Sequence, residues 1–299
     1  MKRFLEMAQE VSLEHADVGH IVGKVNSARR LSGLTNLVLQ LDADNGIFVV
    51  RIPTTTTGKQ IDREAEYFNL SCAAKLGVCE MPLYFDTGTG VMLNRAYALI
   101  DKRPAPEQLG EIVGCLHQGK KAFKGTLEVR SLLEPYLTSA FARSVPDMPA
   151  QSLALADDLA RQVEQALQML HLSFEGSMMV PSHCDLSPGN ILMTQGGLRL
   201  IDFEYSAMAP AVWDLAYAIQ ENAMDVVSEE AFVNAYSACG ALSPAADDLG
   251  AMKLCCDLVS AGWAVQQLSD GNAFGDFTSF ARKRLESASR QFATLSARQ

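Results

Sequence analysis

Two stretches in the second half of the chain decide its fold: HCDLSPGN at 183–190 and LRLIDFE at 198–204. The first is a polar, turn-rich loop, and the second begins as a short apolar strand. Phosphoryl transfer needs a carboxylate that accepts the proton of the attacking hydroxyl, together with oxygen ligands for Mg²⁺. Asp185 fits the role of the base. Asn190 and Asp202 fit the metal ligands, since Mg²⁺ prefers hard oxygen donors.

These motifs resemble a known superfamily. The order H-x-D-x4-N and then I-D-F is similar to the catalytic loop and metal motif of the protein-kinase-like fold. With EYS and WDLA after it, the pattern looks like that of the aminoglycoside phosphotransferase and choline kinase superfamily. The upstream stretches SGLTNLVLQL, FVVRIP and IDREAEYF look like the N-lobe of bacterial choline/ethanolamine kinases. The resemblance covers most of residues 30–295.

The resemblance implies an α+β, protein-kinase-like fold with two lobes. The N-lobe, 1–97, would be a β-rich nucleotide-binding part, with an antiparallel sheet and one helix. The C-lobe, 98–299, would be mainly helical and hold the catalytic loop, metal site and acceptor pocket. Local patterns agree: apolar strands at 37–41 and 47–52 flank a turn signal at 44–46, and helical spacing marks 61–76 and 151–171.

For the nucleotide, the resemblance implies ATP and four groups of contacts. The phosphate-covering loop would contain Ser32, Gly33, Thr35 and Asn36. Arg51 would take the place of the kinase strand lysine and grip the α- and β-phosphates, as a guanidinium can do bidentately. Its partner would be Glu64, with Glu66 as the competing candidate about 200° away on the same helix. Asn94 lies in the stretch expected to form the adenine-binding hinge.

For the acceptor, the resemblance implies a pocket near Glu204, Tyr205, Glu221 and Trp263. Asp214, in the WDLA stretch, would brace the catalytic loop. Ser260 stands where the family often has another tryptophan, so the full aromatic cage that a quaternary ammonium prefers is not evident.

Composition narrows the partners. The net charge of −10 and the lack of a basic run argue against nucleic acid, and mildly favour a cationic substrate. The sequence contains no stretch of about 18 apolar residues, so no membrane-spanning helix is predicted. The seven cysteines have irregular spacing, which indicates reduced thiols, and the N-terminus lacks a signal-peptide pattern, so we expect a cytoplasmic protein.

The function predicted from the sequence is ATP-dependent phosphorylation of the hydroxyl of a small, cationic alcohol such as choline or ethanolamine. Another small acceptor, such as an aminoglycoside, thiamine or a sugar, is the alternative within the class. A catalytically silent nucleotide-binding protein is the alternative outside it. The intact set of Asp185, Asn190 and Asp202 argues against the silent alternative.

Overall fold

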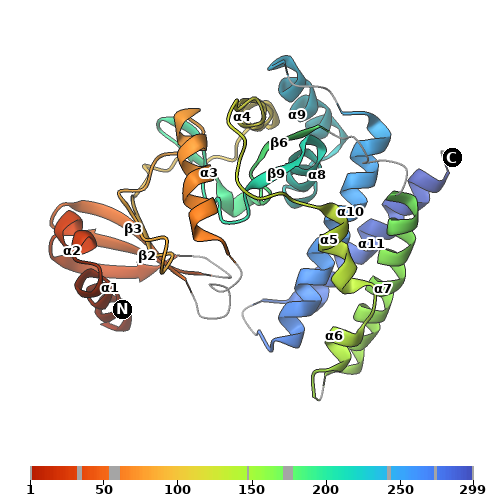
Figure 1. Ribbon diagram of the computed structural model, residues 1–299, viewed down its shortest axis with the longest axis horizontal. Coiled ribbons are helices and arrows are strands. Elements are labelled where there is room, and N and C mark those ends of the chain that lie inside the picture. The colour runs from red at the N-terminus through yellow and green to blue at the C-terminus, as the bar shows by residue number, and fades with distance from the viewer. Residues whose placement is uncertain are drawn as a thin grey trace. The chain divides into compact units, whose positions relative to one another are not determined.

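The computed structural model describes residues 2–31, 36–53, 61–146, 148–170, 178–240, 244–272 and 275–297. The chain forms two compact units (Figure 1). Unit 1 comprises Met1–Pro104 and Ile191–Ser206, and unit 2 comprises Ala105–Asn190 and Ala207–Gln299.

Unit 1 is built on a five-stranded antiparallel sheet with the order β1-β2-β3-β5-β4. Its strands are β1 (Val25–Arg30), β2 (Asn36–Ala43), β3 (Gly46–Pro53), β4 (Tyr84–Phe85) and β5 (Met92–Arg95). The turn predicted at 44–46 is confirmed, because Ala43 pairs with Gly46 and only two residues lie between them. Gly46 has φ +129°, a conformation that favours glycine.

The first two helices cover this sheet and close its core. They are α1 (Lys2–Glu14) and α2 (Ala16–Val22). Val18 and Val22 of α2 pack with Leu39, Leu41 and Phe48 in one cluster of fully buried side chains. Each of these β2 and β3 residues alternates with less buried neighbours, as expected for a sheet with one face on a core.

The helix α3 (Arg63–Lys75) lies between β3 and β4 in the sequence of unit 1, and a later hairpin joins the same unit. This hairpin consists of β7 (Ile191–Thr194) and β8 (Gly197–Leu200), which lie within the range 98–299 expected for the C-lobe. Main-chain hydrogen bonds explain the difference: Ile100 donates to Met193 at 2.9 Å, and Leu200 donates to Val78 at 2.9 Å. Unit 1 therefore contains 98–104 and 191–206 in addition to the range 1–97 expected for the N-lobe.

Unit 2 is mainly helical. Its helices are α4 (Pro106–His117), α5 (Val129–Leu133), the 3₁₀ turn η1 (Glu134–Tyr136), α6 (Ala140–Arg143), α7 (Ala150–Leu170), the 3₁₀ turn η2 (Pro188–Asn190), α8 (Ala211–Glu221), α9 (Val226–Ala238), α10 (Ala246–Ser269) and α11 (Phe277–Ser296). The strands β6 (Met179–Ser182) and β9 (Ala207–Pro210), which the sequence patterns did not reveal, pair antiparallel on either side of the 183–190 loop.

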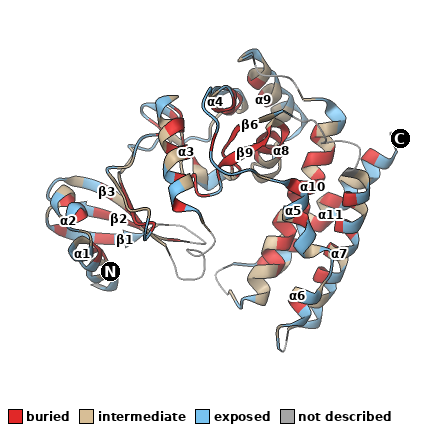
Figure 2. Cartoon of the chain, in the orientation of Figure 1, coloured by how far each residue is buried: buried red, intermediate tan, exposed pale blue. Residues whose placement is uncertain are grey.

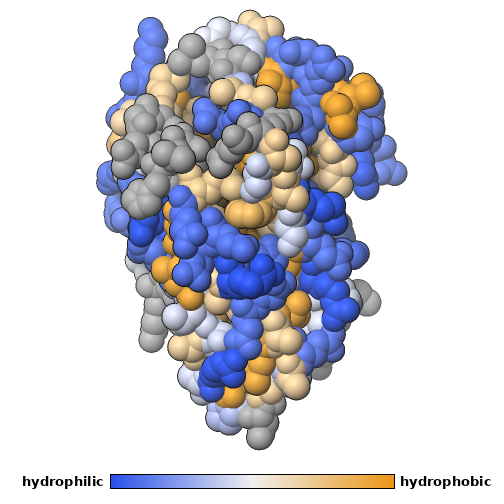
Figure 3. Space-filling model, turned by 90° about the vertical axis from the view of Figure 1, so that its right-hand side faces the viewer, coloured by the Kyte–Doolittle hydropathy of each residue, from blue (hydrophilic) through white to orange (hydrophobic). Residues whose placement is uncertain are grey.

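The long helices of unit 2 pack closely. Gly262 of α10 lies against Tyr136, where a Cβ atom would stand 2.3 Å from the ring, so that only glycine permits this approach. Buried residues recur along one side of most helices in Figure 2. The face shown in Figure 3 is largely hydrophilic, and its hydrophobic residues form separate small groups. Among the described residues, no helix combines the length and apolar character needed to cross a membrane.

Candidate active site

The 183–190 loop is fastened by a buried carboxylate. Asp214, in the first turn of α8, has no exposed surface and accepts the main-chain N–H groups of His183 and Cys184, both at 2.8 Å. Burial alone would raise the pKa of Asp214, but its contacts with His117 and His183 outweigh burial and lower it. The prediction that Asp214 braces the loop is confirmed. The backbone of Cys184 has φ +66°, a strained value for a residue other than glycine, and the two hydrogen bonds to Asp214 hold it in this conformation.

Behind Asp214 lies a histidine that the sequence did not reveal. His117 at the end of α4 contacts Asp214 Oδ2 through Nε2 at 3.1 Å and the hydroxyl of Tyr236 through Nδ1 at 3.0 Å. A carboxylate can only accept here, so Nε2 carries a proton, while Nδ1 and the tyrosine hydroxyl share the second hydrogen bond. This arrangement ties α4, α8 and α9 to the loop.

Asp185 is positioned by two other side chains. The Nδ2 atom of Asn190 donates to the main-chain oxygen of Asp185 at 3.0 Å and to its carboxylate at 2.8 Å. The hydroxyl of Tyr217 on α8 also donates to this carboxylate, and burial raises the pKa of Tyr217 so that it keeps its proton. Asp185 itself is only partly buried. The result is a carboxylate held in one orientation, which is what a general base requires.

The predicted metal ligands fit Mg²⁺ by their chemistry. Because Nδ2 of Asn190 makes the two bonds to Asp185, Oδ1 is the atom that a cation would bind. Asp202 follows β8 with φ +65° and is partly exposed. No group of three His, Cys, Asp or Glu side chains able to hold a metal occurs in the described part of the chain. Mg²⁺ is usually bound by one or two carboxylates together with substrate phosphates.

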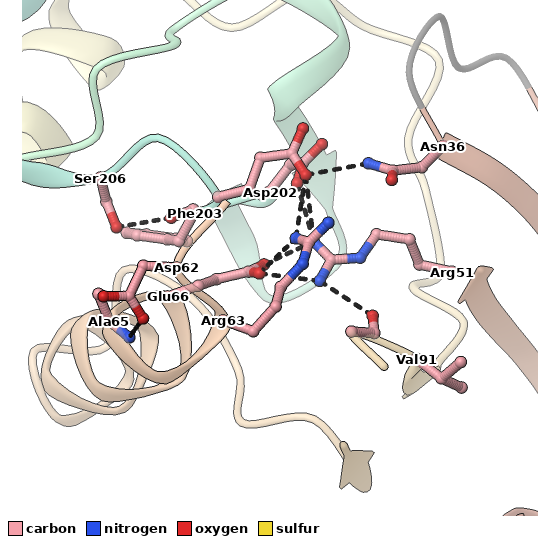
Figure 4. A network of polar contacts seen from close by, with 12 residues as sticks. Asn36, Arg51, Asp62, Arg63, Ala65, Glu66, Val91, Asp202, Phe203 and Ser206 are labelled. Carbon is pink, nitrogen blue, oxygen red and sulfur yellow. Dashed lines mark hydrogen bonds and ion pairs between the residues drawn. The ribbon is translucent and has the colours of Figure 1, made fainter. Parts of the chain in front are cut away.

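In unit 1, an ion network surrounds Arg51 (Figure 4). Both terminal nitrogens of Arg51 contact Glu66, at 2.5 and 3.0 Å, and one also contacts Asp202 at 3.1 Å. Burial by itself lowers the pKa of Arg51, but the hydrogen bond to Glu66 and the nearby negative charges raise it overall. The guanidinium is therefore permanently charged although it is only 4% exposed.

The predicted pairing of Arg51 with Glu64 is corrected to Glu66. The helix α3 begins at Arg63, capped by Asp62, and its buried face contains Arg63, Glu66 and Leu70. Glu64 lies on the exposed face and accepts a hydrogen bond from Thr87 at 2.5 Å. The sequence did contain the signal, since Glu66 shares its helical face with Leu70 and Ala73, whereas Glu64 does not.

Glu204 takes part in the same network. Its side chain is 2% exposed and accepts from Asn36 and Arg63, both at 3.1 Å. Glu204 therefore belongs to the ion network of unit 1, and its predicted contact with the acceptor stays a prediction. Arg63, which sequence reasoning missed, also contacts Glu66 at 2.6 Å. Gly90 makes room for it, since a Cβ atom there would lie 2.7 Å from Nε of Arg63.

For several predicted site residues the structure gives at most a position and does not test the predicted role. Asn94 lies in β5 and is half-buried, and Tyr205 is 45% exposed. Ser32, Gly33 and Thr35 lie outside the described residues. Their roles stay predictions.

The predicted acceptor residues of unit 2 lie among ionic and aromatic partners. Glu221, the last residue of α8, contacts Arg284 of α11 at 2.5 Å and accepts from Ser260 at 3.2 Å. Trp263 of α10 packs edge-on against Phe277 and Phe280. Arg284 is a third residue that sequence reasoning missed, after His117 and Arg63. The sequence did contain an indication, because Arg284 is a cation on the same face of α11 as the buried Phe277, Ala281 and Ala288.

Residues 27–254 match the model of the phosphotransferase enzyme family, APH. The chain belongs to this phosphotransferase family. It is a small-molecule kinase with a two-lobed, protein-kinase-like fold, as the sequence predicted. A similar curated protein is Protein LicA of Haemophilus influenzae, 23% identical over 274 residues, which are 86% of this chain and 77% of that protein.

Solved structures agree on the fold of this kinase. A choline/ethanolamine kinase family protein from Mesorhizobium loti is 27% identical, with a TM-score of 0.75 over 97% of this chain and 99% of that one. The choline kinase LicA from Streptococcus pneumoniae is 23% identical, with the same TM-score and the same coverage of each chain. A spectinomycin phosphotransferase is 12% identical, with a TM-score of 0.65 over 95% of this chain and 98% of that one.

Proposed function

We propose that this kinase transfers the γ-phosphoryl group of ATP to the hydroxyl of a small, positively charged alcohol such as choline or ethanolamine. The observation that carries the proposal is the carboxylate of Asp185, held by Asn190 and Tyr217 on a loop fastened to Asp214. A carboxylate so placed accepts the proton of the acceptor hydroxyl as the oxygen attacks phosphorus.

The nucleotide would be held by residues of the network around Arg51, whose charge is suited to phosphate oxygens. We propose that Asn36, Asn94 and the residues 32–35 contribute to the same task. Asn190 and Asp202 would bind Mg²⁺, which neutralises charge on the phosphates when it is present. Arg51 contacts Asp202 at 3.1 Å and so orients the oxygen that the metal would need.

The cationic acceptor is supported by the carboxylate of Glu221 and by the ring of Trp263 in unit 2. Glu221 lies one turn beyond Tyr217 on α8, and the charge of Asp185 acts on it. The names of the similar proteins, which include choline and choline/ethanolamine kinases, support the same class of acceptor.

A direct test is release of ADP from ATP in the presence of choline, ethanolamine or the neutral isostere 3,3-dimethylbutanol, with and without EDTA. We expect turnover with the amines, little with the isostere, and none with excess EDTA. Equal turnover of the isostere would remove the cationic-acceptor proposal, and full turnover in EDTA would remove Mg²⁺. Aminoglycosides, thiamine and sugars complete the panel as alternative acceptors.

A further inference from the structure

Three helices of unit 2 bring one cation and two carboxylates together. Arg284 of α11 contacts Glu221 of α8 through NH2 at 2.5 Å and Asp257 of α10 through NH1 at 3.1 Å. The side chains of Arg284 and Glu221 are each 13% exposed, while that of Asp257 is fully buried. Asp257 also accepts a hydrogen bond from Gln220. Arg284 is thus anchored on the buried carboxylate and reaches the more accessible one with its other nitrogen.

This cluster is linked to the base of the reaction. Tyr217 donates to Asp185 and precedes Glu221 by one helical turn. Burial raises the pKa of Glu221, while Arg284 and Ser260 oppose this rise and the charges of Asp185 and Asp257 add to it. Under the proposed function, an acceptor whose hydroxyl lies at Asp185 would extend toward the turn of α8 that contains Glu221.

Arg284 also occupies an aromatic face. Its guanidinium carbon lies 4.9 Å from the centre of the Phe280 ring. Trp263 meets Phe280 and Phe277 edge-on, with ring centres 6.2 and 5.4 Å apart. A quaternary ammonium is normally bound by the faces of several aromatic rings. Here the carboxylate of Glu221 and one face of the Phe280 ring, which could bind the quaternary ammonium, are already in contact with Arg284.

We propose that Arg284 determines acceptor specificity by competing with the acceptor for Glu221, and that the site thereby favours a primary amino alcohol over a quaternary one. The inference rests on the proposed function, since it concerns the same acceptor end. A primary ammonium donates charge-assisted hydrogen bonds and can replace the guanidinium at Glu221. A quaternary nitrogen has no N–H group and offers only its charge. When Glu221 is taken, Arg284 keeps its contacts with Asp257 and Phe280.

The test compares kcat/KM for ethanolamine, choline and 3,3-dimethylbutanol in the wild type and in Arg284→Met. We expect the wild type to prefer ethanolamine. Arg284→Met should lower the ratio of kcat/KM for ethanolamine to kcat/KM for choline about tenfold, mainly because KM for choline falls. This size is within the range of coupling energies measured in one ion-pair network. The isostere should not respond. Arg282→Met, an exposed neighbour on α11, is the matched control and should change neither ratio.

A second variant distinguishes a change in acceptor specificity from a loss of folded protein. Arg284→Met leaves the buried Asp257 without its cation, whereas Arg284→Met with Asp257→Asn removes both charges together. The double variant should show the same narrowed preference, with a thermal unfolding midpoint close to that of the wild type. An unchanged ethanolamine-to-choline ratio in both variants would overturn the role of Arg284. If the wild type phosphorylates neither amine, the proposed function itself fails, and Arg284 loses the role with it.

Discussion

Replacement of Asp214 by asparagine tests how the 183–190 loop is held. Three donors point at this carboxylate: the main-chain N–H of His183 and His117 Nε2 reach Oδ2, and the N–H of Cys184 reaches Oδ1. Asparagine keeps one oxygen and places an NH₂ group where the other stood. At least one buried N–H then faces a donor and loses its partner.

The magnitude follows from these three bonds. A buried N–H left without a partner costs about 1–3 kcal/mol, and each remaining bond loses the assistance of the negative charge, about 1 kcal/mol apiece. We therefore expect Asp214→Asn to lower the free energy of unfolding of unit 2 by about 3–5 kcal/mol, a large part of the ~5–15 kcal/mol typical of a protein.

The assay uses intrinsic fluorescence in a denaturant titration, because both tryptophans, Trp213 and Trp263, lie in unit 2. Asp225→Asn is the matched control. Asp225 is the exposed N-cap of α9, a position that asparagine fills equally well. The pKa of Asp214 is lowered in the folded state. Its contribution to the free energy of unfolding is therefore fully present above the pKa of the unfolded chain, about 3.9, and is lost as pH falls through the lower pKa of the folded protein. A variant within about 1 kcal/mol of the control at neutral pH would refute this account of the loop.

Three further outcomes are expected. Asp185→Asn should lower kcat by roughly 10²–10⁴-fold with nucleotide affinity largely kept, and a variant that retains more than about a tenth of the activity would show that Asp185 is not the base. A double-mutant cycle of Arg51→Met and Glu66→Gln on unfolding free energy should show coupling of about 1–3 kcal/mol, with Glu64→Gln as a silent control; strictly additive losses would contradict the ion pair. Since burial raises the pKa of Glu221, KM for a cationic acceptor should rise as pH falls through that raised value, and Glu221→Gln should abolish the pH dependence; the same profile in the variant would assign it to another group.

Local sequence patterns determined much of this protein. The β2–β3 hairpin, the helix after it and the long α7 follow from alternation, turn residues and helical spacing, which depend on neighbours along the chain. The order of the motifs that contain Asp185, Asn190 and Asp202, followed by EYS and WDLA, indicated a kinase because it resembles the pattern of a known superfamily. Asp214 could be assigned its supporting role from its place in a family motif.

The tertiary structure decided which charges meet. Glu66 and not Glu64 reaches Arg51 because the buried face of α3 is set by its packing. Glu204 is drawn into the network of Asn36 and Arg63, far away in sequence. The hairpin β7–β8 joins unit 1 through hydrogen bonds to main-chain groups near Val78 and 98–100, which no local pattern encodes.

The same limit applies to the acceptor end. Glu221 is a carboxylate at the end of a helix in the sequence, and an attractive partner for a cationic alcohol. In the folded chain it is already paired with Arg284, which α11 brings to it from 63 positions later in the sequence. Hydrophobic periodicity indicates that a helix face is buried but does not specify which side chain lies opposite. The charge that an acceptor meets therefore depends on how α8, α10 and α11 pack together.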